Sequence, residues 1–376
     1  MNRSDLDRNA YMLFGSLAKR GYLRWWHSFT GHSTVSGRSR TFFVEYLILN
    51  PLRGCFKRSA DKQQSYVQIT AGVFPSEGEK GLQFVSRYPV RAAKYAKHPL
   101  YFQVDENIMS ENRISGFLNI PPQEAESVDY YTNSGSIEWD IEINKTLACH
   151  TGIIGSPLMS ALNALDSFWH GEGIRSQMRG FVTIDDETYE ISPEESFGYA
   201  DKHWGRSYNN PWLQLASCDL ISQRTGKPLK NSALAIDGCC PRFLFFRLKP
   251  CLMMQLTYTG EDFCFSFARP LNPSRMKWAT KEQSRHIGWH IKGQSAKAYF
   301  KLTLTSAKKD LMKLSYDDPG ATAREHIERK PLWAGANASG TIDLYRMTPK
   351  GREWLDSLTI RNAFCEFQKP SGDSRK

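Results

Sequence analysis

Alternation of hydrophobic and polar residues is the strongest pattern along the chain, and it predicts β-strands. Residues Ile137–Asn144 alternate without exception: Ile137, Trp139, Ile141 and Ile143 lie on one side, and Glu138, Asp140, Glu142 and Asn144 on the other. This period of two is typical of a strand with one buried face. Residues Tyr66–Val73 alternate in the same way, and Thr41–Leu49 is rich in aromatic and β-branched residues. Phe181–Ile184 and Thr188–Ile191 flank the acidic turn Asp185–Glu187 and predict a hairpin.

Further short strands are expected along the rest of the chain, with Gly, Pro and Asn between them. They are Phe243–Leu248, Met253–Tyr258, Phe263–Phe267, His286–Ile291, Ala298–Thr305, Thr341–Tyr345 and Phe364–Phe367. Residues 152–169 interrupt the series and predict either a helix or a long connection. Recurrent short strands predict an all-β fold, an antiparallel sandwich or barrel with two halves of similar strand content. The polar end, residues 368–376, is expected to be a disordered tail.

Two segments offer amphipathic surfaces. Residues 5–20 predict a short helix with Leu6, Leu13, Phe14 and Leu17 on one side; it is expected to cap a barrel, and lying on a membrane is the alternative. The segment from Arg87 to His98 interleaves basic and aromatic residues. It is interpreted as a solvated face, with a peripheral membrane contact as the second interpretation.

Composition narrows the class of protein. The chain of 376 residues is 40% hydrophobic and 12% aromatic, enough for a sizeable core or for a pocket that holds a greasy ligand. No apolar run reaches the roughly 20 residues that span a bilayer. The N-terminus lacks the apolar core of a signal peptide, so a cytoplasmic location is expected. Eight cysteines without a CxxC pair predict reduced, buried thiols. The net charge of +10 suits an acidic membrane surface or solubility; without a nucleic-acid motif, nucleic-acid binding is not expected.

Several chemistries are excluded by spacing. His286 and His290 have HxxxH spacing, but they alternate with Ile287, Trp289 and Ile291. On a strand they lie about 13 Å apart, too far for one ion, so no metal site is predicted. The row Glu138, Asp140 and Glu142 is interpreted as an exposed sheet face, the alternative being a cavity wall with acids of raised pKa. There is no G-x-S-x-G elbow and no nucleotide-binding glycine loop, so no cofactor is predicted. Nothing indicates an oligomeric state.

The segment Gly198-Tyr199-Ala200-Asp201-Lys202-His203-Trp204-Gly205 holds the densest chemistry in the chain. Two interpretations are open. In the first, it is a structural turn in which Asp201 caps backbone donors and Trp204 fills the core. In the second, Asp201 is a carboxyl between aromatic rings, an arrangement that suits proton transfer in a partly dry site.

These residues and their neighbours resemble the tocopherol cyclase family, especially its bacterial members. The resemblance is strongest from His170-Gly171-Glu172-Gly173, through Tyr189–Pro193 and Gly198–Gly205, to Pro211-Trp212-Leu213-Gln214-Leu215. Weaker matches are Trp26–Gly31, Arg40–Tyr46 and Gly340–Tyr345. The family usually has Asn where this chain has His203. An imidazole titrates near neutral pH and an amide does not, so this departure bears on activity.

The resemblance, which extends more distantly to carotenoid 1,2-hydratases, implies two lipocalin-like antiparallel β-barrel or sandwich halves. They are expected at 1–175, led by the helix, and at 176–367. It also implies acid-catalysed addition across a prenyl double bond: a phenol of the same molecule closes a chromanol ring in the cyclase, and water adds in the hydratase. Asp201 is the expected acid, with His203 setting its protonation. Tyr199, Trp204, Trp212, Gln214 and His170 are the expected substrate-binding residues. Lys202 is expected to point away, since its charge would lower the pKa of the acid.

Three functions therefore remain in view. The leading expectation is an enzyme that binds a hydrophobic prenylated molecule and cyclises it. A hydratase of a polyene is a variant of that expectation. A carrier or sensor with the same pocket and no catalysis is the alternative from a different class, because one scaffold hosts many functions.

Overall fold

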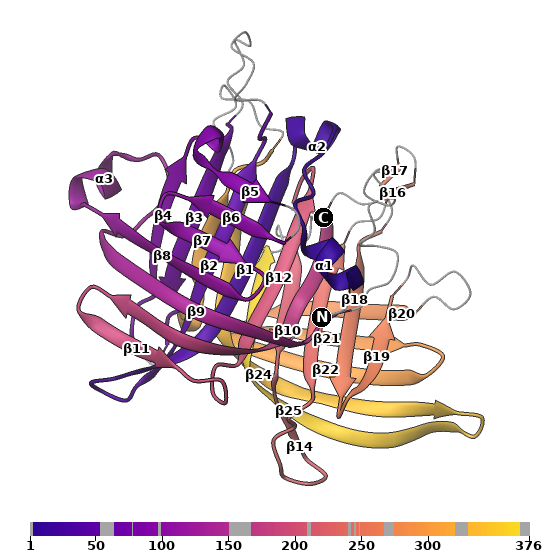
Figure 1. The fold of residues 1–376 in the computed structure, drawn as a ribbon. Helices are drawn as coiled ribbons and strands as arrows, with labels where there is room; N and C mark the ends of the chain where they lie inside the picture. Colours follow the sequence, from indigo (N-terminus) through magenta and orange to yellow (C-terminus); the bar gives the residue numbers. More distant parts are fainter. Residues whose placement is uncertain are drawn as a thin grey trace.

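Two antiparallel sheets make up almost all of the molecule (Figure 1). The computed structural model describes residues 3–52, 64–76, 78–96, 99–149, 167–208, 212–239, 242–243, 246–247, 249–266, 274–319 and 330–368. Within these residues one sheet has twelve strands and the other eleven. The predicted all-β fold class, with antiparallel sheets and a few short helices, is confirmed.

The first sheet takes the chain up to Gly205, in the order β4-β3-β2-β1-β11-β10-β9-β8-β7-β6-β5, and β12 pairs with both β1 and β10. It curls strongly in Figure 1, where it runs from indigo to magenta. Its strands are β1 (Tyr22–Ser33), β2 (Ser39–Leu49), β3 (Tyr66–Val73), β4 (Leu82–Tyr88), β5 (Lys94–Ala96), β6 (Tyr101–Val104), β7 (Asn107–Ser110), β8 (Arg113–Ile120), β9 (Gly135–Leu147), β10 (Ser167–Ile184), β11 (Glu187–Ile191) and β12 (Gly198–Gly205).

The second sheet takes the chain from Leu213 to Gln368, in the order β19-β18-β15-β13-β25-β24-β22-β21-β20, with β14 on β25 and β23 on β24. Its strands are β13 (Leu213–Ser217), β14 (Asp219–Ser222), β15 (Ala233–Cys239), β18 (Cys251–Tyr258), β19 (Glu261–Phe265), β20 (Arg275–Glu282), β21 (His286–Gln294), β22 (Ala298–Ala307), β23 (Met312–Tyr316), β24 (Lys330–Thr348) and β25 (Gly351–Gln368). A separate ribbon pairs β16 (Arg242–Phe243) with β17 (Phe246–Arg247), so the single strand expected at Phe243–Leu248 is wrong.

The chain passes from one sheet to the other between Gly205 and Leu213. The expected division at 175/176 therefore falls inside β10, and the division into two domains stays a prediction. One apolar core joins both sheets, because it holds Trp26 and Trp204 of the first sheet together with Ala216 and Phe364 of the second. A second core lies within the second sheet. The expected tail lies outside the described residues except for Gln368, which ends β25. Residues 152–166 of the expected interruption also lie outside them, and its last three residues, 167–169, belong to β10.

The N-terminal segment forms two short helices, α1 (Arg3–Asn9) and α2 (Ser16–Lys19), so the single helix expected over residues 5–20 is wrong. Lys202 of β12 donates hydrogen bonds to the carbonyl oxygens of Arg8 and Ala10. Gly15 adopts φ +55°, which a helix interior does not allow. The segment thus covers one end of the first sheet, as expected of a cap. The third helix of the described residues is α3 (Pro122–Ser127), and single 3₁₀ turns occur at Val90–Ala92 and Lys308–Asp310.

Most strands expected from alternation are present. Tyr66–Val73 is β3, and Ile137–Asn144 lies within β9 with its isoleucines and Trp139 buried and Glu138 and Glu142 exposed. The acidic row therefore faces solvent, as interpreted from the sequence. His286 and His290 lie on strand β21, as their alternation indicated. Cys149, Cys218 and Cys365 are buried, as the sequence indicated, whereas Cys251 and Cys264 are only partly buried.

Candidate functional site between the two sheets

Strand β12 (Gly198–Gly205) carries polar and ionisable side chains on both of its faces. Alternation points Tyr199, Asp201 and His203 toward the second sheet, where Asp201 meets Gln214 of β13 and His203 meets Asp237 of β15. All eight residues of the strand are buried. The turn interpretation is therefore wrong: the segment is a central strand, and Asp201 accepts its hydrogen bonds from side chains.

Asp201 presents two carboxylate oxygens in different situations. Oδ2 accepts hydrogen bonds from Trp169 Nε1 and Tyr199 OH, each at 2.9 Å, and from Gln214 Nε2. Oδ1 is buried and has no hydrogen-bond partner. Burial raises the pKa of Asp201 to about 6, although Arg24 and the three donors oppose the shift. When Asp201 is protonated, Oδ1 is therefore the oxygen left to carry a transferable proton.

His203 bridges two acids. Its Nε2 lies 3.0 Å from Asp237 Oδ1, and its Nδ1 lies 3.5 Å from Asp201 Oδ2. Burial, with the Arg24 charge, lowers the pKa of His203 well below its usual value, and burial raises the pKa of Asp237 well above its own. Both shifts favour the neutral forms. In such a neutral pair Asp237 donates to Nε2 and the ring proton is carried by Nδ1, which faces Asp201.

A buried ion cluster lies beside this acid. Arg24 of β1 donates to Glu45 Oε2 at 2.6 Å and to both carboxylate oxygens of Glu366 at 2.7 and 2.9 Å. Trp212 Nε1 and Tyr316 OH also donate to this cluster, at 3.0 Å to Glu366 and 2.7 Å to Glu45. Since the two carboxylates come from different sheets, the cluster links the sheets at the site and covers the arginine charge.

Several polar atoms around Asp201 are buried without a partner. They are Asp201 Oδ1, Gln214 Oε1, His203 Nδ1, Trp26 Nε1 and Tyr208 OH. Trp26 lies opposite Asp201 in the β1–β12 pairing, and Tyr208 packs on Trp212 with ring centres 5.7 Å apart. An unsatisfied buried polar atom costs about 1–3 kcal/mol. A group of them at one place marks a position where a polar ligand atom or water would be stabilised.

Five of the seven predicted site residues meet at this place: Tyr199, Asp201, His203, Trp212 and Gln214. Trp204 and His170 do not. Trp204 stacks on Phe168 at 5.5 Å and lies beside Lys202, on the opposite face of β12. His170 pairs with Lys202 in the β10–β12 ladder and shares that face. The expectation that Trp204 and His170 lie beside Asp201 is therefore wrong. Residues an odd number of positions apart along a strand point to opposite faces, and Trp204 is three positions from Asp201. Lys202 points away from Asp201, as expected.

The sequence interpretation missed four important neighbours: Trp169, Trp26, Asp237 and the Arg24–Glu366 pair. Trp169 directly precedes His170 in the chain. Because side chains alternate along a strand, Trp169 points to the opposite face from His170, which is the face that holds Asp201, and this alternation was the signal that could have identified it. Asp237 and Glu366 lie within strand-like runs and carry no local signal.

A second polar cluster occupies the other face of β1 and β12. Lys145 Nζ lies 2.8 Å from Glu172 and 3.2 Å from Glu111, and His27 Nε2 lies 3.7 Å from Glu172. Burial raises the pKa of Glu172 to about 7 and lowers that of His27 to about 3. Glu172 sits where the β10–β12 register shifts between His170 and Gly173. Glu172 of the His170–Gly173 motif therefore belongs to this second cluster.

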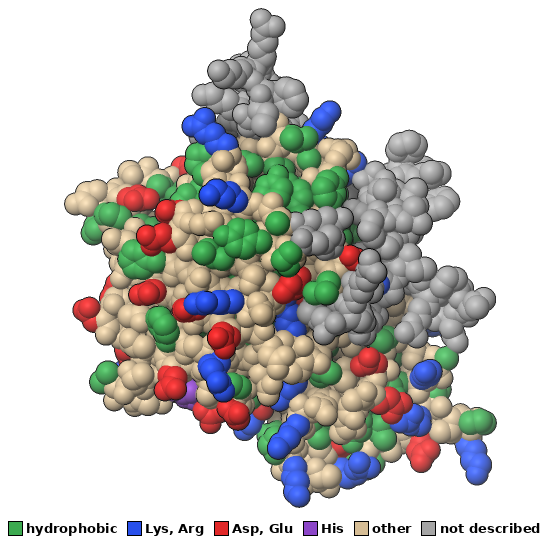
Figure 2. Space-filling view, viewed as in Figure 1, with side chains coloured by type: hydrophobic (Ala, Val, Ile, Leu, Met, Phe, Trp, Pro, Cys, Tyr) green, Lys and Arg blue, Asp and Glu red, His purple; other side chains and the backbone are tan. Residues whose placement is uncertain are grey.

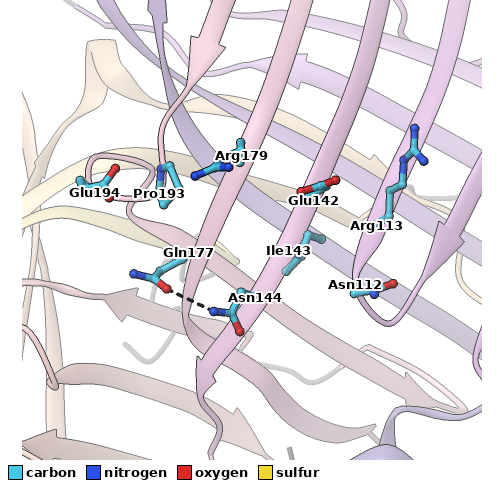
Figure 3. A pocket seen from close by; sticks show the side chains of 9 residues that line it. All are labelled: Asn112, Arg113, Glu142, Ile143, Asn144, Gln177, Arg179, Pro193 and Glu194. Atoms are coloured by element: carbon cyan, nitrogen blue, oxygen red, sulfur yellow. Dashed lines mark hydrogen bonds between the residues drawn. The ribbon is translucent and has the colours of Figure 1, made fainter.

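A polar hollow lies on the outside of the first sheet, and Asp201 is not among the residues that line it (Figure 3). It has a volume of about 770 Å³, and Figure 3 shows Glu142 between Arg113 and Arg179 on neighbouring strands, with Asn144 bonded to Gln177 at 3.2 Å. A smaller hollow of about 470 Å³ lies near Arg175 and Asp219. Charges of both signs line the first hollow, so it favours neither cations nor anions.

Comparisons with known proteins give fold-level similarity alone. No protein-family model and no curated protein matches the chain. Among solved structures, a protein provisionally named AttH from Nitrosomonas europaea has a TM-score of 0.44 at 11% identity over 92% of each chain. Kievitone hydratase from Nectria haematococca has a TM-score of 0.46 at 14% identity over 96% of this chain and 94% of the other. Membership of the tocopherol cyclase family stays a prediction.

Among the described residues no group of three His, Cys, Asp or Glu side chains is arranged to hold a metal ion. No helix in the described part of the chain is long and apolar enough to cross a bilayer.

Proposed function

We propose that the protein binds a hydrophobic prenylated molecule between its sheets and protonates one of its carbon–carbon double bonds with Asp201. The observation that carries the proposal is the asymmetry of this carboxyl: three donors hold Oδ2, while buried Oδ1 has no partner. An acid so held is aimed in one direction, and a pKa of about 6 leaves about one carboxyl in ten protonated at pH 7.

The reaction then proceeds without a cofactor. The alkene takes the Oδ1 proton and becomes a tertiary carbocation, and the phenol oxygen of the same molecule adds to it. The phenol proton returns to Asp201, so the net change is an isomerisation that closes a chromanol-type ring. Water as the nucleophile would give hydration. The neutral His203–Asp237 pair faces Oδ2 and supports reprotonation of the acid.

The surroundings suit a short-lived cation. The side chains of Trp169 and Tyr199 lie at hydrogen-bond distance from Asp201, and a ring face turned toward the cation contributes about 0.5–2 kcal/mol by cation–π attraction. Arg24 would repel a carbocation if its charge were bare. Its bidentate pairing with Glu366 removes that repulsion.

Asp201→Asn tests the proposal. The variant is expected to lose turnover of a prenylated hydroquinone by about 10²–10⁴-fold, the usual contribution of a positioned acid, while the Kd from tryptophan quenching stays within about threefold. In D₂O the wild-type product should carry one solvent deuterium on carbon. Asp356→Asn is the matched control, since Asp356 is as buried but lies against Ser222 and Tyr258, and it should retain turnover. Full activity of Asp201→Asn would exclude this acid.

A carrier or sensor of an apolar ligand is the second candidate. Full burial of Asp201 favours it, since a substrate can reach Oδ1 only when neighbouring elements move. A wild-type protein that binds prenylated hydroquinones and polyenes tightly, and converts none of them, would decide for the carrier.

A further inference from the structure

An apolar pocket of about 800 Å³ opens at one end of the first sheet and shares no lining residue with the polar hollow of Figure 3. Tyr11, Leu13, Phe14, Ala18, Leu52 and Tyr95 contribute to its lining. Three parts of the chain build it: residues 11–18, which lie between α1 and α2 and within α2; residues 51, 52 and 65, beside β2 and β3; and residues 89–95 around β5. Tyr11 stacks on Tyr95 with ring centres 4.4 Å apart and an angle of 5°, so the first and last of these parts are held together.

Large apolar side chains protrude around this pocket. Phe14 is 57% exposed, Tyr95 47% and Leu52 41%. Figure 2 shows hydrophobic side chains gathered on this upper part of the molecule, with basic side chains at its margin. A contiguous exposed apolar surface of this kind is uncommon on a soluble chain and marks an interaction site.

The margin is cationic. Lys19 ends α2 and Arg20 follows it, while Arg91 and Lys94 lie on the Pro89–Tyr95 side of the pocket; all four are exposed. The chain as a whole carries a net charge of +10. An apolar centre with a basic margin matches the interface of an anionic bilayer, where acyl chains meet acidic headgroups.

We propose that this end of the first sheet docks on an anionic lipid bilayer, with Phe14, Leu52 and Tyr95 entering the interface and Lys19, Arg20, Arg91 and Lys94 contacting acidic headgroups. Each of these cations can contribute about 1 kcal/mol near such a surface. The proposal goes beyond the proposed function and does not rest on it, since no residue of the Asp201 site takes part. A chain that also converts prenylated lipids would receive them here.

Sedimentation with vesicles tests the docking. Wild-type protein should bind vesicles of phosphatidylcholine mixed with phosphatidylglycerol and bind phosphatidylcholine alone much more weakly, with the difference shrinking as salt rises. Arg91→Glu with Lys94→Glu should weaken binding to the anionic vesicles by about tenfold or more. Phe14→Ser with Leu52→Ser should weaken it on both kinds of vesicle.

Matched control variants distinguish binding by the proposed docking surface from a general effect of net charge. Lys277→Glu with Lys281→Glu makes the same charge change on exposed β20, and Trp354→Ser removes an exposed aromatic residue, 50% exposed, on β25. Both should bind like wild type, and circular dichroism should show that every variant is folded. Asp201→Asn should also bind like wild type, which keeps this test independent of catalysis. Absence of wild-type binding, or equal losses in patch and control variants, would overturn the proposal.

Discussion

Asp201 is held at hydrogen-bond distance by a tryptophan, a tyrosine and an amide, all of them neutral. This differs from the buried acid on the opposite face, Glu172, whose carboxylate lies 2.8 Å from the Lys145 ammonium. Both acids have raised pKa values, of about 6 and about 7. Only Glu172 is the partner of a buried cation, so the two should respond differently to removal of their charge.

Asp201→Asn should stabilise the protein at pH 8. The folded pKa of about 6 exceeds the ordinary value of 3.8, so the fold favours the protonated form. Its stabilising contribution is complete below pH 3.8 and is lost as pH rises to about 6, by up to about 3 kcal/mol. Urea unfolding at pH 3.5 and pH 8 measures this: the variant should gain stability over wild type only at pH 8.

Glu172→Gln provides the contrast, since it leaves Lys145 with Glu111 as its remaining acidic partner. The raised pKa of Glu172, about 7, by itself favours loss of the charge at pH 8, as for Asp201. Removing one partner of a buried ion pair opposes this with a cost of about 3–5 kcal/mol, so the net change at pH 8 should be a smaller destabilisation. A stabilising effect of Glu172→Gln at that pH would contradict the distinction drawn between the two acids.

Turnover should fall with rising pH through the titration of Asp201. The protonated carboxyl is the reactive form, so kcat should drop about tenfold for each pH unit above about 6.

His203→Asn tests the family departure: an amide can still contact Asp237 but does not titrate, and because His203 is already neutral the pH profile should keep its shape. A profile that loses its fall above pH 6 in this variant would assign the titration to His203.

At the scale of elements, the sequence predicted regularly alternating strands well and strands with buried charged residues poorly. β3 and β9 follow from period-two patterning, although all eight residues of β3 are buried, whereas β12 buries Asp201, Lys202 and His203 in succession. Polar residues inside a strand erase the pattern, so this strand resembled a turn. The single helix expected at the N-terminus was wrong for a related reason, because a residue distant in sequence is involved. Lys202, 192 residues beyond Ala10, donates a hydrogen bond to the Ala10 carbonyl oxygen.

Gly180 sets the geometry of the long strand β10, and Gly180→Ala should destabilise the protein by about 2–4 kcal/mol. Its φ is +144°, and a Cβ there would collide with the carbonyl oxygen of Asp140 on β9. Thermal unfolding checks this. Gly37→Ala is the control: Gly37 has φ +68° but nothing within 4 Å of the added carbon, so its loss should be about 1 kcal/mol. Equal losses at the two sites would refute the collision.

At the scale of the whole molecule, the Arg24 cluster joins partners that are 342 residues apart in sequence. No local sequence pattern predicts such a pairing, and Asp237, 34 residues beyond His203, also lies outside any motif. The five predicted residues that do meet were found because they lie on two neighbouring segments, Tyr199–His203 and Trp212–Gln214. The sequence therefore indicated one wall of the site, and the second sheet and β1 supply the rest.

Arg24→Met should destabilise both sheets together. It leaves Glu45 and Glu366 buried without their cation, a loss of about 3–5 kcal/mol. Because one core spans the two sheets, wild type and variant should each unfold in a single transition, followed by tryptophan fluorescence and by circular dichroism. Two separated transitions in the wild type would show that the halves are independent.

The two faces of β12 also limit how the protein can diverge. A deletion or insertion of one residue within Gly198–Gly205 would exchange the faces, placing the Lys202 ammonium against Arg24 and moving Asp201 to the side of α1. Such a change would disrupt both the Asp201 site and the contacts of Lys202 with the N-terminal segment. Descendants of this gene can therefore vary the site by substitution, while the length of this strand remains under strict selection.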